Sequence, residues 1–171
     1  GALLQLATQT KWSNLDYLIV DLPPGTGDIQ LTLAQRIPVT GAIIVTTPQD
    51  IALLDCKKGI EMFRKVDIDV LGVIENMSVH ICSNCGHHEP LFGEGGGHRI
   101  AEAYGTEVLG EMPLHKTIRE QTDAGNPTVV AEPDSEVAHL YRDIARKVSA
   151  MISQKPIDTR HSFPNISINI L

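Results

Sequence analysis

Aromatic residues, cysteines and long apolar runs are all scarce in this sequence of 171 residues. Aromatics make up only 4%, so the core has to be built from Ile, Val, Leu and Ala. Three cysteines are too few for the disulfide framework of a small secreted protein, which favours a reducing cytoplasm. No apolar stretch approaches the roughly 18 to 20 residues that cross a membrane. The net charge of −7 argues against a nucleic-acid groove, so we predict neither a membrane nor a nucleic-acid partner.

The sequence also lacks a phosphate-binding loop of the form G-x-x-x-x-G-K-[ST]. The glycine-rich stretch 93–97 contains neither the lysine nor the hydroxyl of that motif, and Glu94 would repel a phosphate. We therefore interpret this stretch as a turn that leads into a helix at His98.

What is present is an alternation of apolar strands and amphipathic helices, which is typical of a doubly wound, mostly parallel α/β sheet. The predicted strands are 17–21, 42–46, 70–74 and the surroundings of 108–109. The predicted helices are 28–36, 50–66, 98–104, 116–124 and 135–152. We expect one domain over residues 1–152 with an excursion from the sheet at 79–97, and a loosely held tail at 153–171.

One segment joins an apolar run to an acidic loop. Tyr17–Val20 reads as a buried strand that ends in Asp21, and Leu-Pro-Pro-Gly-Thr-Gly-Asp follows. Ligands of parallel α/β sheets bind at the carboxyl ends of strands, and in nucleotide hydrolases an Asp there reaches magnesium. Gly25 lets the loop approach a ligand closely, and Asp28 adds a second acid. The alternative is an ordinary strand followed by a Pro-Gly turn.

Asn76 follows the predicted strand 70–74. Its amide offers one acceptor and two donors, which suits the edge of a purine. An Asn at a strand end is also a common turn former, and both interpretations stay open.

The excursion contains Cys82-Ser83-Asn84-Cys85, a spacing that lets two thiolates bind one metal or cluster. An all-cysteine site needs four thiolates, so His87, His88 or a second copy of the chain must complete it. We favour a second copy related by a two-fold axis. A redox dithiol and incidental cysteines are the alternatives. Cys56 lies within a predicted helix, and we expect it to be a small buried residue.

Taken together, these motifs resemble the Mrp family of P-loop ATPases, the iron–sulfur cluster carriers related to MinD and ParA. The resemblance covers about residues 12–152. Its marks are D-L-P-P-G-T-G-D at 21–28, T-T-P-Q at 46–49, E-N-M-S at 75–78, the Cys82/Cys85 pair with Gly86, F-G-E-G-G-G at 92–97, G-E-M-P-L at 110–114 and G-N-P at 125–127.

The resemblance implies an ATP-dependent homodimer that bridges a labile 4Fe–4S cluster and delivers it to apo-proteins. It implies that Asp21 is the Walker B acid, with Gly25 and Asp28 in the adjoining switch. Asn76 and the Pro113 loop match the adenine-contacting region. Cys82 and Cys85 match the cluster ligands.

Members of the family carry their phosphate loop N-terminal to the part represented here. We therefore expect this chain to be the C-terminal portion of a longer protein, to bind ATP weakly or not at all alone, and to have exposed sheet edges. Two other functions stay open: a MinD- or ParA-like ATPase switch with structural zinc at the CxxC, and a remnant that binds neither ATP nor metal.

Overall fold

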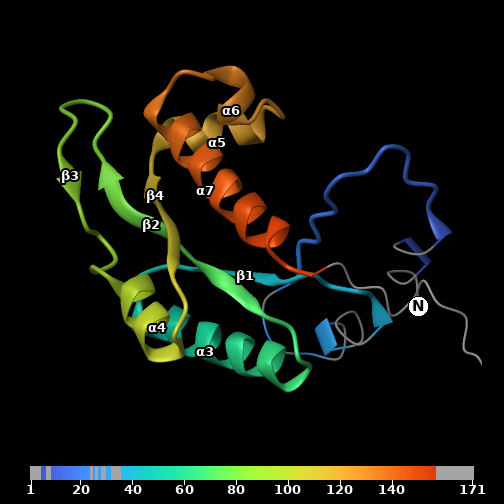
Figure 1. Cartoon of the computed structure of the whole chain (residues 1–171). Coiled ribbons are helices and arrows are strands. Elements are labelled where there is room, and N and C mark those ends of the chain that lie inside the picture. The colour runs from blue at the N-terminus through green and yellow to red at the C-terminus, as the bar shows by residue number, and fades with distance from the viewer. Residues whose placement is uncertain are drawn as a thin grey trace, which may run out of the picture.

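A mixed sheet forms the centre of the computed structural model, which describes residues 5–6, 9–23, 25, 27, 30–31 and 36–156. In these ranges the sheet has four strands: β1 (Ala42–Thr46), β2 (Val70–Ile81), β3 (His88–Glu89) and β4 (Val108–Leu114). β1 and β4 pair with β2 in parallel, one on each edge, and β3 pairs with it antiparallel (Figure 1). The α/β architecture with a mostly parallel sheet is as predicted.

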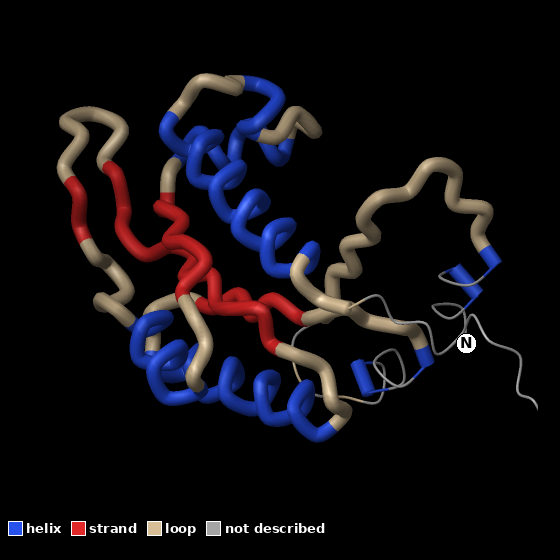
Figure 2. The backbone as a smooth tube through the Cα atoms, viewed as in Figure 1, coloured by secondary structure: helices blue, strands red, loops and turns tan. Residues whose placement is uncertain are grey.

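Helices cover both faces of this sheet (Figure 2). α3 (Asp50–Lys65) and α4 (Gly96–Tyr104) lie on one face, and α7 (Glu136–Ser153) lies on the other (Figure 1). The short helices α5 (Lys116–Asp123) and α6 (Thr128–Ala131) lie near the beginning of α7. Among the described residues, no helix is both long and apolar enough to cross a membrane.

Successive residues of β2 point to opposite faces and join two separate cores. Val73 is fully buried in a cluster with Ile44 of β1, Ile60 of α3 and Ile100 of α4. Its neighbour Ile74 packs on the other side, in the cluster that α7 forms with β4. A residue's place in β2 therefore decides which helices it contacts.

The four predicted helices from residue 50 onward match the structure to within two residues at each end. Gly105 ends α4 in the left-handed conformation, and the Ser135 hydroxyl caps α7 by accepting the Ala138 N–H. Gln49 occupies the N-cap position of α3. On α7, the large side chains of Leu140 and Tyr141 are exposed.

One strand prediction is wrong and another is too short. Residues 17–21 form no strand, and Ile19 is 91% exposed. A strand needs a partner for its backbone groups, and in the described residues this run has none while β1 pairs only with β2. The strand predicted at 70–74 continues to Ile81, so the segment from Val79 begins inside the sheet and returns as β3.

Some predictions fall on parts of the chain that the structure does not describe. Asp28 and most of the helix predicted at 28–36 lie outside the described residues, as does the predicted tail from residue 157 onward. The described start of that tail is held to the sheet, because Lys155 Nζ lies 2.5 Å from a carboxylate oxygen of Asp69 and 3.0 Å from the Thr40 carbonyl oxygen. The domain boundary at residue 152 remains a prediction.

Candidate metal centre

The CxxC sequence occupies the tip of the hairpin formed by β2 and β3. The Cys82 N–H donates to the His87 carbonyl at 3.0 Å, and the Gly86 N–H donates to the Cys82 carbonyl at 2.8 Å. Gly86 has a φ of +70°, a conformation that glycine adopts without strain. The hairpin projects beyond the helices that cover the sheet (Figure 1). Both cysteines are therefore presented on one tight turn at the edge of the molecule.

This turn favours the thiolate form of Cys82. The backbone N–H of Asn84 lowers the pKa of the Cys82 thiol, and the N–H and thiol of Cys85 lower it further. A lowered pKa and nearby donors are what a metal-binding thiolate needs.

The third cysteine belongs to a different environment. Cys56 lies in α3, is 7% exposed and packs in the core beside Ile60. Burial raises the pKa of its thiol to about 11. It is the small buried residue that its position in a helix predicts.

The turn at 82–87 contains two cysteine thiols. No group of three or more His, Cys, Asp and Glu side chains that suits a metal ion occurs in the part of the chain that the structure describes. His87 and His88 therefore do not complete a site with the cysteines, although the sequence left this open.

A bulge in β2 sets the direction of the hairpin. The pairing of β2 with β4 shifts register between Asn76 and His80, and Met77 adopts a φ of +55°. Asn76 Oδ1 accepts the Met77 N–H at 3.0 Å, and the Ser78 hydroxyl donates to the Met112 carbonyl at 3.2 Å. Bulges commonly redirect a strand next to a functional site. Here the bulge lies six residues or fewer before Cys82.

The two residues predicted to contact adenine lie on neighbouring strands. Asn76 pairs in register with Met112, and the buried Pro113 follows directly. Asn76 lies within β2 and not beyond its tip as expected, because the strand continues to Ile81. Its amide oxygen is occupied by the local turn at Met77.

Two of the three residues predicted for the magnesium side, Asp21 and Gly25, lie in the described part of the chain. Asp21 and Gly25 are exposed, and Gly25 has a φ of +100° with open space around it. Among the hydrogen bonds and ion pairs of the described residues, none joins Asp21 to Asn76 or Pro113. Asp28 lies outside the described residues, and the magnesium side remains a prediction.

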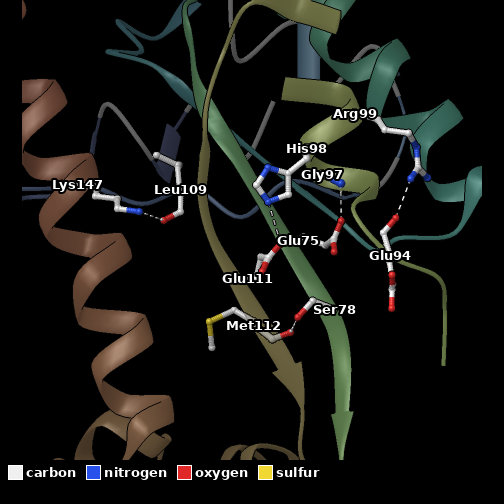
Figure 3. Close-up of polar contacts among 10 residues, drawn as sticks. All are labelled: Glu75, Ser78, Glu94, Gly97, His98, Arg99, Leu109, Glu111, Met112 and Lys147. Atoms are coloured by element: carbon white, nitrogen blue, oxygen red, sulfur yellow. Dashed lines mark hydrogen bonds and ion pairs between the residues drawn. The ribbon is translucent and has the colours of Figure 1, made fainter. Parts of the chain in front are cut away.

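Sequence reasoning missed one buried acid. Glu75 is 1% exposed, and its Oε2 accepts a hydrogen bond from the Gly97 N–H at the start of α4 (Figure 3). An acid directly after the apolar run 70–74, together with consecutive glycines at 96–97, was the available signal. Glycine pairs at a helix start often mark a close approach of another group.

Two histidines outside the CxxC turn make specific contacts. His98 is exposed, with Nε2 lying 3.0 Å from Glu111 Oε1 (Figure 3). His115 is half-buried and caps α5, since its Nδ1 accepts the Thr117 N–H at 3.3 Å. His161 lies outside the described residues.

Residues 1–149 match the family described as ParA: NUBPL iron-transfer P-loop NTPase. The chain belongs to this family. The resemblance read from the motifs is thereby confirmed.

Two relatives of this iron-transfer NTPase family are named iron–sulfur cluster carrier proteins. That of Escherichia coli K12 is 63% identical over 151 residues, covering 88% of this chain and 41% of its own length. That of Pseudomonas fragi is 67% identical over 145 residues, covering 85% of this chain and 50% of its own. The mouse iron–sulfur cluster transfer protein NUBPL is 49% identical over 91% of this chain and 49% of its own. The chain therefore spans about half the length of these relatives or less.

Solved structures agree on the fold. A nucleotide-binding protein from Archaeoglobus fulgidus, solved with ADP, is 40% identical and aligns with a TM-score of 0.62 over 73% of this chain and 50% of its own. The MinD cell division protein of Aquifex aeolicus aligns with a TM-score of 0.60 over 80% of this chain and 54% of its own, at 23% identity. The sheet and helices are thus those of a MinD- or ParA-like P-loop NTPase.

Proposed function

We propose that this chain is the cluster-holding part of an iron–sulfur cluster carrier, which binds a 4Fe–4S cluster and delivers it to apo-proteins. The observation that carries the proposal is the turn at 82–87, where two cysteines lie together and backbone N–H groups lower the pKa of Cys82. Thiolates with such donors suit iron–sulfur clusters. The names of the relatives support the same function.

A 4Fe–4S cluster bound by Cys82 and Cys85 requires two chains. A 4Fe–4S cluster takes four thiolates, and each chain provides Cys82 and Cys85. A two-fold axis through the cluster supplies the other pair from a second copy. We therefore propose a homodimer in which the hairpin tips meet at the cluster.

Release begins at Cys85 in this proposal, because that residue is exposed while Cys82 is half-buried. An acceptor thiol gives up its proton as its sulfur forms a bond to iron and the bond from iron to the Cys85 sulfur breaks. The proton of the acceptor thiol ends on the freed Cys85, so charge balances and the oxidation state of the cluster does not change. Four such exchanges move the whole cluster.

Nucleotide binding belongs to the complete protein. We propose that Asp21, Gly25 and Asp28 serve the magnesium and γ-phosphate side there, and that Asn76 and Pro113 lie on the adenine side. The ADP-bound relative from Archaeoglobus fulgidus supports a nucleotide site in this fold. The cytoplasm is the compartment we propose, because it keeps both thiols reduced.

Anaerobic reconstitution with iron and sulfide tests the ligand assignment. The wild-type chain should gain absorbance near 400 nm and about two iron atoms per chain, as one shared cluster requires. Cys82→Ala/Cys85→Ala should gain neither, whereas the matched variant Cys56→Ala should behave as wild type. Equal absorbance from the double variant would refute the assignment.

Zinc at the same cysteines would indicate a different function, an ATPase switch with a structural metal. Incubating the reconstituted protein with an apo-ferredoxin separates the two functions. A carrier should activate the acceptor at the rate at which it loses its own cluster. A protein that keeps its metal while the acceptor stays inactive would contradict the carrier function.

A further inference from the structure

One buried carboxylate closes the loop that contains both cysteines. Glu75 lies on β2, seven residues before Cys82, and its Oε2 accepts the N–H of Gly97 in the first turn of α4 (Figure 3). The two partners are 22 residues apart in sequence, and the whole hairpin lies between them. The hydrogen bond therefore joins the two ends of the cysteine-bearing segment.

The chemistry of this contact makes it strong. Glu75 is 1% exposed, and a buried carboxylate is costly unless donors compensate it. The first turn of a helix offers unpaired N–H groups and the positive end of the helix dipole. A hydrogen bond from such a group to an ionised acid is stronger than a neutral one. The acid thus fixes the start of α4 against β2.

Two glycines allow the close approach. A Cβ on Gly97 would lie 3.1 Å from Glu75 Cβ and 3.2 Å from Oε2. A Cβ on Gly96 would lie 2.9 Å from the Cα of Pro48, the residue two positions after β1. The first turn of α4 is therefore fitted between the carboxyl end of β1 and the side chain of Glu75.

We propose that Glu75 is a positioning residue for the cluster thiolates. Its carboxylate, by anchoring Gly97, limits the movement of residues 82–96 and so slows the loss of the cluster from Cys82 and Cys85. The effect on the loss of the cluster rests on the proposed function. The anchoring of Gly97 rests on its hydrogen bond to Glu75. Glu75 itself does not touch the cluster.

A matched control lies on the next strand. Glu111 of β4 pairs in register with Glu75, and its carboxylate contacts His98, the residue after Gly97. The Glu111 side chain is 47% exposed and the His98 side chain 65% exposed, so solvent screens this pair. Glu111→Gln removes the same charge from the same helix end without opening the buried contact.

The test compares wild type, Glu75→Gln and Glu111→Gln after anaerobic reconstitution. Each should contain the same iron and show the same absorbance. On addition of the chelator bathophenanthroline, Glu75→Gln should lose its cluster about tenfold faster, the scale expected for a weakened buried charged hydrogen bond. Its visible circular dichroism should change as well. Glu111→Gln should match wild type in both measurements.

Equal release rates for all three proteins would overturn the role of Glu75, and so would a Glu111→Gln effect as large as that of Glu75→Gln. Amide hydrogen exchange of the metal-free proteins provides a second measurement that needs no cluster. Glu75→Gln should speed exchange in residues 88–99 about tenfold while leaving α7 unchanged. Unchanged exchange in residues 88–99 would refute the anchoring role of Glu75, whether or not the wild type binds a cluster. Failure of the wild type to bind a cluster would refute only the proposed function.

Discussion

At the residue scale, the same side chain has different chemistry in different places. Burial among Ile60 and its neighbours raises the pKa of Cys56 to about 11, whereas N–H groups at the hairpin tip lower that of Cys82. Residue type alone does not separate the two. Their surroundings do, because desolvation opposes the thiolate and hydrogen-bond donors stabilise it.

Alkylation of the folded protein should reveal this difference. With iodoacetamide at pH 7, Cys82 should react at least about 100-fold faster than Cys56, because a tenfold loss of thiolate accompanies each unit by which a pKa is raised. The rate at Cys82 should rise with pH and level off below the usual thiol range. Peptide mass spectrometry measures both rates.

The denatured protein is the control, since all three cysteines should then react at similar rates. Comparable rates for Cys56 and Cys82 in the folded protein would contradict the two environments.

The raised pKa of Cys56 makes the free energy of unfolding fall as the pH rises. A thiol held neutral in the folded state contributes fully below its ordinary pKa, and this contribution is lost as the pH rises through about 11.

At the scale of elements, β2 links the core of the molecule to its candidate site. Its first half is buried between β1 and β4, and its second half passes through the bulge at Met77 into the hairpin. The same strand therefore holds Val73 in the core, Glu75 under α4 and, just past its end, Cys82. Packing of the core and placement of the thiolates are mechanically connected.

The packing of α7 against β4 also stabilises the sheet. Ile144 is 9% exposed, and a Cβ on Gly110 would lie 2.6 Å from its Cγ1. Ile144→Ala should lower the free energy of unfolding by about 2–4 kcal/mol, because the helix rests so closely on the strand that the cavity cannot collapse. Urea unfolding followed by circular dichroism measures this.

Leu140→Ala on the same helix is the matched control. Leu140 is 36% exposed, so its truncation should cost less than about 1.5 kcal/mol. A cost at Leu140 equal to that at Ile144 would show that α7 is seated differently.

At the scale of the whole molecule, the proposed site is complete only in a dimer. Reconstituted protein should therefore elute from a size-exclusion column at twice the mass of the metal-free protein. Removing the cluster with a chelator should return it to the monomer, because the shared ligands then no longer hold the chains together. Sedimentation velocity under anaerobic conditions is an independent measurement.

Cys82→Ala/Cys85→Ala should remain monomeric after the same treatment. A cluster-loaded monomer would contradict the shared site and require other ligands in each chain. A dimer that persists in the double variant would mean that another surface joins the copies.

The sequence by itself determined the strand 42–46 and the described helices from residue 50 onward except the short α6 at Thr128–Ala131, which it missed. The signal of these helices is local, because it lies in the amphipathic spacing of their apolar residues. It also determined that Cys82 and Cys85 share one turn, since two intervening residues leave little choice. The family was readable in the same way, from motifs in order along the chain.

Only the tertiary structure decided which apolar run joins the sheet. Residues 17–20 have the composition of a buried strand, yet they are exposed, whereas β2 extends seven residues beyond its predicted end. Strand formation depends on partners that are distant in sequence, so local composition does not settle it. The burial of Glu75 has the same cause. Its partner Gly97 is 22 residues away, and only folding brings the carboxylate and the helix end together.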